Sequence, residues 1–143
     1  MKILVCTDGS VQSKKAAEEA AKIAGNMKEV EVSILSVCDE PEIPDVDQGF
    51  PMDIRRQLME CKHNELEGVL REAEELFKEK NIEVNKIIKD GHVVSVILDT
   101  IKETGAELVV MGAHGKSGFK GLFLGSVGNA VAQRADANVL LVK

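Results

Sequence analysis

Short apolar runs alternate along the chain with longer stretches in which apolar residues recur every three or four positions. A short apolar run is typical of a buried strand, and the longer spacing is typical of a helix with one buried face. The alternation predicts five strands, over residues 2–7, 30–37, 82–89, 108–111 and 138–143. It also predicts four helices, one beginning after Ser10 and the others over residues 53–80, 93–102 and 126–135.

Two of these helices have informative faces. The first carries alanines on one side, from Ala16 to Ala24, which would let it lie close to a sheet. In the long helix the apolar positions predict this buried half: Ile54, Leu58, Cys61, Leu66, Val69, Ala73, Leu76 and Phe77. Residues 38–52, with three prolines and five acids, are predicted to form an exposed loop.

Strands that alternate with helices predict a parallel sheet covered on both faces, with right-handed crossovers. The first and fourth strands are the most continuously apolar and should be the most central, which gives the order 3-2-1-4-5. We therefore predict a single doubly wound α/β domain over residues 1–143. In this order the connections reverse between strands one and four, and ligands bind at such a switch point.

Composition narrows the possible functions. A net charge of −6 and the absence of Trp and Tyr argue against nucleic-acid binding. No apolar run approaches the roughly 20 residues of a membrane span, and Met1-Lys2 leads directly into a strand, so we expect no leader and no membrane association. Three cysteines without regular spacing favour a reducing cytoplasm. Cys61-Lys62-His63 lacks a second ligand pair at a standard spacing, so we predict no metal centre built from protein ligands.

The most specific motif is Gly112-Ala113-His114-Gly115, followed after nine residues by Gly125-Ser126. It joins a predicted strand to the start of a predicted helix, where glycines allow close approach and free N–H groups favour an anion. A P-loop is excluded because position 110 is Val110 rather than glycine, and the G-x-G-x-x-G fingerprint is absent. The spacing predicts a phosphate cradle, although a plain glycine turn and an ordinary Ser126 N-cap remain alternatives.

A second motif should meet the first. Asp8 follows the first strand, whose carboxyl end lies beside that of strand four in the predicted order. A carboxylate next to phosphates would be repelled, so Asp8 is better suited to accept hydrogen bonds from ribose hydroxyls; its alternative role is to cap the first helix. Val37 ends the neighbouring strand and could offer its backbone to an adenine edge, or could simply be a core residue.

The spacing G-x2-G-x9-G-[ST], the opening Ile3 to Ser10 and the ending Val139 to Val142 resemble the universal stress protein family over the whole chain. The resemblance implies a Rossmann-like, adenine nucleotide alpha hydrolase-like fold that binds ATP, ADP or AMP, with Mg²⁺ or Mn²⁺ held through the phosphates. It implies a regulatory role in the stress response. The site expected from motif and resemblance together comprises Thr7, Asp8, Val37, Met111, Gly112, His114, Gly115, Gly125, Ser126 and Val127.

Two other functions stay open. Hydrolysis needs a water-activating base, and His114 is the one candidate in the loop motif, so we expect slow ATP hydrolysis at most. A dimeric interaction module that binds no nucleotide is the second alternative. The apolar strand 138–143 lies at a predicted sheet edge without a protecting proline or inward charge, and the resemblance points to the same edge, so we expect a homodimer through it.

Overall fold

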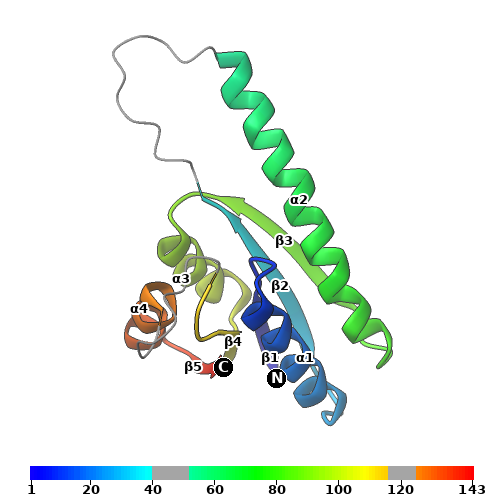
Figure 1. Ribbon diagram of the computed structural model, residues 1–143. Coiled ribbons are helices and arrows are strands. Elements are labelled where there is room, and N and C mark those ends of the chain that lie inside the picture. The colour runs from blue at the N-terminus through cyan, green and yellow to red at the C-terminus, as the bar shows by residue number, and fades with distance from the viewer. Residues whose placement is uncertain (40–51, 116–124) are drawn as a thin grey trace.

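The computed structural model describes residues 1–39, 52–115 and 125–143. In chain order its elements are β1 (Lys2–Cys6), α1 (Val11–Gly25), β2 (Glu31–Cys38), α2 (Met52–Lys78), β3 (Val84–Asp90), α3 (Val93–Thr104), β4 (Leu108–Gly112), α4 (Ser126–Arg134) and β5 (Asn138–Val142). They follow the predicted order of strands and helices (Figure 1). The loop predicted at 38–52 lies, except for its ends, outside the described residues.

The five strands form one parallel sheet in the order β3-β2-β1-β4-β5, which confirms the predicted topology. β1 and β4 lie side by side, with Ile3 paired to Leu108 and Cys6 to Met111. Their side chains are buried from Ile3 to Cys6 and from Val109 to Met111. The two carboxyl ends that carry the candidate motifs are therefore neighbours at the centre of the sheet.

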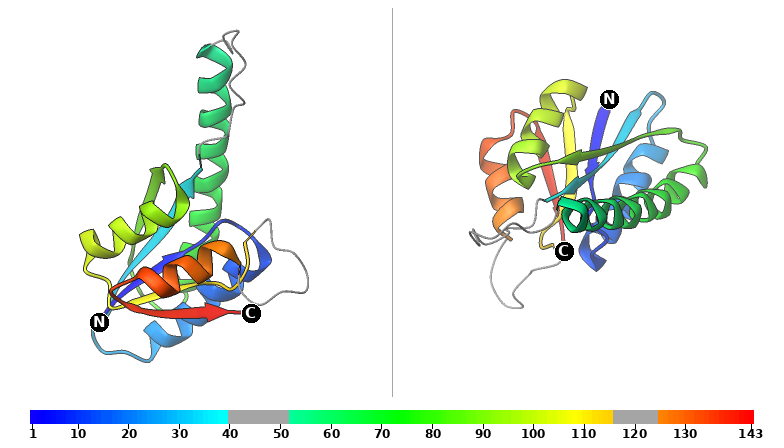
Figure 2. Two further views of the ribbon diagram at one scale, coloured as in Figure 1. Left: turned by 90° about the vertical axis from the view of Figure 1, so that its left-hand side faces the viewer. Right: turned by 90° about the horizontal axis from the view of Figure 1, so that it is seen from above.

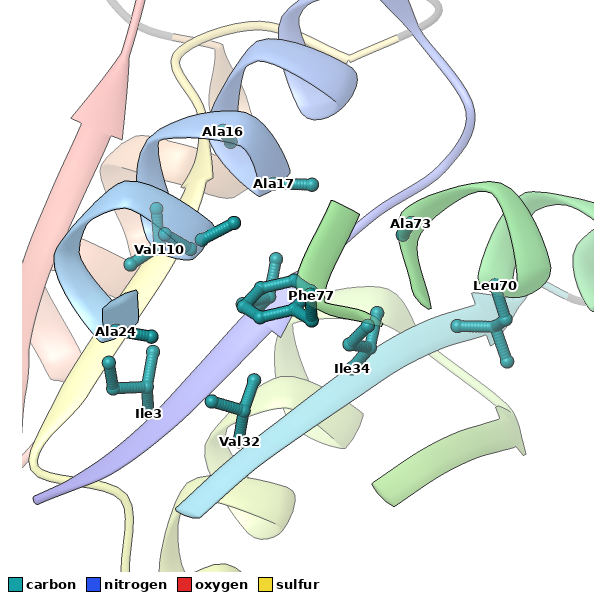
Figure 3. Packing of buried hydrophobic residues seen from close by; sticks show 13 residues of the cluster. Ile3, Ala16, Ala17, Ala24, Val32, Ile34, Leu70, Ala73, Phe77 and Val110 are labelled. Atoms are coloured by element: carbon teal, nitrogen blue, oxygen red, sulfur yellow. The ribbon is translucent and has the colours of Figure 1, made fainter. Parts of the chain in front are cut away.

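Helices α1 and α2 cover one face of the sheet, and α3 and α4 cover the other, as seen along the sheet in Figure 2. Side chains alternate between the faces, so Ile3 and Val5 point to α1 whereas Leu4 and Cys6 point to α3. The alanines of α1 are almost fully buried and bring its backbone close to the strands, and Phe77 of α2 fills the space beside them (Figure 3). The alanine face was predicted correctly.

The junction of α2 and β3 differs from the predicted boundaries. Helix α2 ends at Lys78, not Lys80, and β3 begins at Val84, not Ile82. Asn81 adopts a left-handed conformation with φ 57°, and the N–H of Ile82 returns to the carbonyl of Phe77 at 3.0 Å. These contacts close the helix end as a tight turn, so the apolar Ile82 belongs to the turn rather than to the strand.

The predicted buried half of α2 is correct only for its carboxyl-terminal part. Leu66, Ala73 and Phe77 are buried together with Leu70, which the prediction did not include. Ile54 and Leu58 are 43% and 49% exposed, and Cys61 is exposed, contrary to prediction. The physical reason is length: 27 residues make a helix of about 40 Å, and its amino-terminal part stands clear of strands only five to eight residues long (Figure 2).

Candidate functional site

The two sequence motifs meet at the carboxyl ends of β1 and β4. A β carbon built on Gly115 would lie 2.8 Å from Oδ2 of Asp8, so the glycine loop after β4 passes against the carboxylate that follows β1. These residues are separated by more than one hundred positions in sequence. Their contact falls at the switch point of the sheet, where the α/β topology places ligands.

The turn between β1 and α1 is built around Asp8. Its Oδ1 accepts a hydrogen bond from the N–H of Ser10 at 2.9 Å, across Gly9, whose φ of 78° requires a glycine. Ser10 is the N-cap of α1, with its Oγ accepting from the N–H of Ser13 at 3.2 Å. The predicted start of a helix after Ser10 is thus confirmed. Asp8 holds the turn and does not cap the helix, and its second oxygen lies towards Gly115.

A buried polar seam, the hydrogen-bonded side chains of Thr7, Ser13 and Ser36, supports this turn. Thr7 is 6% exposed, and its hydroxyl donates to Oγ of Ser13 at 3.1 Å. Its carbonyl accepts from the hydroxyl of Ser36 at 2.8 Å. Thr7 therefore ties β1 to α1 and β2 and fixes the direction of the following Asp8. Ser36 was not singled out from the sequence, where it is one of two serines in an apolar strand.

Glycine is needed at the end of β4 for a close approach of backbones. A β carbon on Gly112 would lie 3.0 Å from the backbone carbon of Gln12 and from the carbonyl oxygen of His114. Beyond it, Ala113 is fully buried and its carbonyl accepts from the N–H of Gly125 at 2.8 Å. This bond brings the start of α4 back to the end of β4.

Gly125, and not Ser126, is the N-cap of α4. The alternative of an ordinary Ser126 N-cap is therefore wrong; Ser126 is the first helical residue. Because a glycine cap has no side chain, it makes no side-chain hydrogen bond to the first turn. A helix start of this kind, with glycine backbone beside it, suits a phosphate group.

The other predicted site residues contribute mainly to packing. Met111 is 6% exposed, and Val37 and Val127 are half-buried beside the same cluster between the sheet and α3 and α4. Any ligand contact from these residues would come from the backbone or from one edge of the side chain. His114 is half-buried and Gly115 is exposed. The structure thus brings the motif residues to one end of the sheet, with Val37 at the end of β2.

Two hollows occur at the opposite end of the sheet. One is lined by Met1, Lys2 and acidic residues that include Glu31 and Glu107, and the other by the α3–β4 and α4–β5 turns. Carboxylates in such a lining would repel phosphate. Neither hollow includes the glycine loop, so the chemistry of the candidate site lies at the carboxyl end.

Cys6 is the last residue of β1 and directly precedes Thr7 and Asp8. It is buried, and burial raises the pKa of its thiol to about 12. The thiol is therefore neutral and acts as a small apolar residue. In the described part of the chain, no helix has both the length and the apolar character of a membrane span.

A doubly wound α/β domain with a glycine loop at its switch point has a Rossmann-like architecture. Comparison with known families identifies the family, which the architecture alone does not. The profile described as the Universal stress protein family matches residues 1–143, and the chain belongs to this family.

Individual relatives match this chain over nearly its full length and theirs. Universal stress protein YxiE of Bacillus subtilis is 35% identical over 146 residues, which cover 99% of this chain and 98% of that protein. The solved structure of MJ0577, a universal stress protein of Methanocaldococcus jannaschii, has a TM-score of 0.86 at 28% identity, covering 99% of this chain and 94% of that one. A universal stress protein solved in complex with cAMP has a TM-score of 0.73 at 27% identity, covering 100% and 97%.

Proposed function

We propose that this protein binds an adenine nucleotide at the carboxyl ends of β1 and β4 and acts as a nucleotide-dependent regulator in the stress response. The observation that carries the proposal is the contact of Gly115 with Asp8, which joins two motifs of suitable chemistry at the switch point. A relative of similar fold has been solved with cAMP, an adenine nucleotide. We propose ATP as the nucleotide.

Each part of the site has a role in this proposal. Asp8 accepts hydrogen bonds from the ribose, and the backbone of Gly112 to Gly115 passes along the ribose and phosphates. The first turn of α4, from Gly125 to Val127, holds the phosphates through its amides and the Ser126 hydroxyl. The backbone of Val37 contacts the adenine edge, and Thr7 and Met111 lie beneath the base.

A divalent cation fits this arrangement through the phosphates. Asp8 is an acidic group at this end of the sheet, and one of its oxygens is already used by Ser10. The cation, Mg²⁺ or Mn²⁺, would therefore be held by the nucleotide and would screen the phosphates from Asp8. When bound, it supplies charge neutralisation.

Calorimetry on nucleotide-stripped protein tests the proposal. ATP with Mg²⁺ should bind in a one-to-one ratio, and GTP should bind more weakly if the β2 end reads adenine. Because the chain has no Trp or Tyr, bound nucleotide also dominates its near-ultraviolet spectrum. Absence of heat with ATP, ADP, AMP and cAMP would refute nucleotide binding and leave the dimeric interaction module as the function.

A glycine variant locates the site. Gly115→Ala places a methyl group 2.8 Å from the Asp8 carboxylate and should weaken ATP binding by about tenfold, since it displaces that carboxylate. Gly68→Ala is the matched control, because a β carbon there meets nothing within 4 Å. Equal affinities for the two variants would mean that the nucleotide binds elsewhere.

We propose binding rather than turnover as the working activity. His114 is the imidazole nearest the phosphate cradle in sequence, and catalysis would also require a group that orients it. A phosphate-release assay comparing the parent with His114→Gln checks this. Hydrolysis that disappears in the variant would favour a slow ATPase with His114 as base.

We further propose a homodimer through β5, which is an edge of the sheet. The N–H of Asn138 and the carbonyl of Val142 bond towards β4. Because backbone groups alternate along a strand, Val139 and Leu141 present theirs to the outer edge. Leu141→Pro should then give a monomer with an intact fold, whereas Leu140→Pro, which removes an inward N–H, should destabilise the sheet. A monomeric parent in light scattering at tens of micromolar would contradict the dimer.

The cytoplasm is the location that we propose. Cys6, Cys38 and Cys61 are all free thiols, which suits a reducing compartment. Fractionation of cells that express the untagged chain would test it.

A further inference from the structure

Three potential metal ligands from three different elements meet at the ends of β2 and β3. Cys38 is the last residue of β2 and Asp90 the last residue of β3, and the two are register partners in the parallel ladder. Partners in a ladder direct their side chains to the same face of the sheet. On that face α2 passes, and its His63 places Nε2 2.7 Å from Oδ1 of Asp90. The Cys38 sulfur, the His63 nitrogen and the Asp90 oxygen all lie within 4.8 Å of one another.

We propose that Cys38, His63 and Asp90 form a binding site for Zn²⁺, with three protein ligands and a fourth position open. A thiolate, an imidazole and a carboxylate are the ligand types that zinc accepts in proteins, whereas Mg²⁺ and Ca²⁺ select oxygen ligands alone. Within the residues that the structure describes, this is the only group of three such side chains close enough to share an ion.

The distances suit a tetrahedral ion after small side-chain movements. With metal–ligand bonds of about 2.0–2.3 Å, neighbouring ligand atoms lie about 3.3–3.6 Å apart. The His63–Asp90 contact must therefore open by about 0.6 Å, and the sulfur, which lies within 4.8 Å of the other two atoms, must approach by up to about 1.2 Å. Both side chains can move, because His63 is 39% and Asp90 51% exposed. The backbone is already fixed, since the N–H of Gly91 bonds to the carbonyl of Cys38 at 3.1 Å.

A bound Zn²⁺ would balance the charges of the thiolate and the carboxylate. Cys38 is 1% exposed, and burial, followed by the nearby Asp90 carboxylate, raises the pKa of its thiol, while Lys62 acts in the opposite direction. Without metal the thiol keeps its proton. With Zn²⁺ the thiolate and the carboxylate neutralise the two positive charges, and the thiol proton is released to solvent.

The site is separate from the proposed nucleotide site. Val37 packs into the cluster under α3 and α4, whereas Cys38, the next residue, faces α2. An ordinary surface ion pair would explain His63 and Asp90, but it would not require a buried thiol beside them. Cys61 is two residues from His63 in sequence, yet it is exposed and lies outside the cluster.

Titration of the untagged full chain with Co²⁺ tests the site optically, and Zn²⁺ calorimetry measures its affinity. Co²⁺ should bind in a one-to-one ratio with a sulfur-to-metal charge-transfer band in the near ultraviolet and visible bands typical of tetrahedral cobalt, and Zn²⁺ should abolish both. Cys38→Ser should remove the charge-transfer band. His63→Gln and Asp90→Asn should each weaken Zn²⁺ binding by about tenfold or more.

Cys61→Ser is the matched control, because it removes an exposed thiol two residues from His63 and should leave spectrum and affinity unchanged. Asp90→Asn alters a half-exposed group, so it tests the site even if Cys38→Ser fails to fold. Calorimetry in buffers of different ionisation enthalpy should show release of the thiol proton, and affinity should increase with pH. A Co²⁺ spectrum without the sulfur band, or one that survives Cys38→Ser, would overturn the proposal, as would Zn²⁺ affinity equal to that of a Cys38→Ser/His63→Gln variant.

Discussion

The turn between β1 and α1 leaves no room for a side chain at Gly9. Its φ is 78°, a conformation that L residues rarely adopt, and a β carbon built there would lie 2.8 Å from Cγ2 of Val69 on α2. Replacing Gly9 with alanine therefore combines backbone strain with overpacking. Because Gly9 joins Asp8 to Ser10, the change also tests how firmly the candidate site is held.

The loss in free energy of unfolding caused by Gly9→Ala follows from the backbone strain and the overpacking. The left-handed conformation costs an L residue about 1 kcal/mol, and overpacking of this kind costs about 1–3 kcal/mol. The smaller conformational entropy of the unfolded alanine chain offsets about 0.4–1 kcal/mol. Gly9→Ala should thus lower the free energy of unfolding by about 2 kcal/mol, which corresponds to a melting temperature about 8 °C lower.

Urea unfolding followed by circular dichroism separates the two contributions. In a Val69→Ala background the steric clash is relieved, so Gly9→Ala should cost only about 0–0.6 kcal/mol, and the coupling between the sites should be about 1.5–2 kcal/mol. Gly68→Ala is the control, and on the open surface of α2 it should stabilise by about 0.5–1 kcal/mol. An equal cost of Gly9→Ala in both backgrounds would refute the clash with Val69, and no cost in either would refute the strain as well.

The remaining predictions concern the core, a pH-dependent ion pair and cysteine reactivity. Phe77 is fully buried between α1 and the sheet, so Phe77→Ala should lower the free energy of unfolding in urea by about 3–5 kcal/mol. A hydrogen bond from the Lys86 ammonium lowers the pKa of Glu74, so the advantage in melting temperature of the parent over Glu74→Gln should be full near neutral pH and disappear as pH falls through the folded-state pKa of Glu74. Iodoacetamide at pH 8 should label the exposed Cys61 rapidly and Cys6 only after unfolding, as peptide mass spectrometry would show, because burial raises the pKa of Cys6 to about 12.

The sheet order was predictable because it depends on patterns that lie along the chain. The most apolar strands, Lys2–Cys6 and Leu108–Gly112, occupy the centre, as continuous burial requires. The meeting of Asp8 with Gly115 followed from that order, because parallel strands bring their carboxyl ends to one edge. The family resemblance and the predicted topology independently place Asp8 and Gly115 in the same site.

Other features of the fold and site depend on how neighbouring strands align and on how long each strand and helix is. No local sequence pattern encodes either property. The face of α2 that is apolar was visible in the sequence, but where the helix leaves the sheet depends on the span of β2 and β3. The seam of Thr7, Ser13 and Ser36 needs the alignment of two strands and a helix. The same holds for Cys38 and Asp90, which are partners only because β2 and β3 pair in one particular register.

Helix α2 is continuous in geometry but not in resistance to local opening. From Met52 to Glu60 its described side chains are exposed or half-exposed, so this part has few tertiary contacts, and an isolated helix of such length is marginal in water. From Leu66 onward, opening would expose the core and requires global unfolding. Amide hydrogen exchange should therefore slow by orders of magnitude along a single helix, with the change near His63. The ion pair of His63 with Asp90 at the end of β3, or an ion bound between them, therefore lengthens the portion of α2 that stays closed.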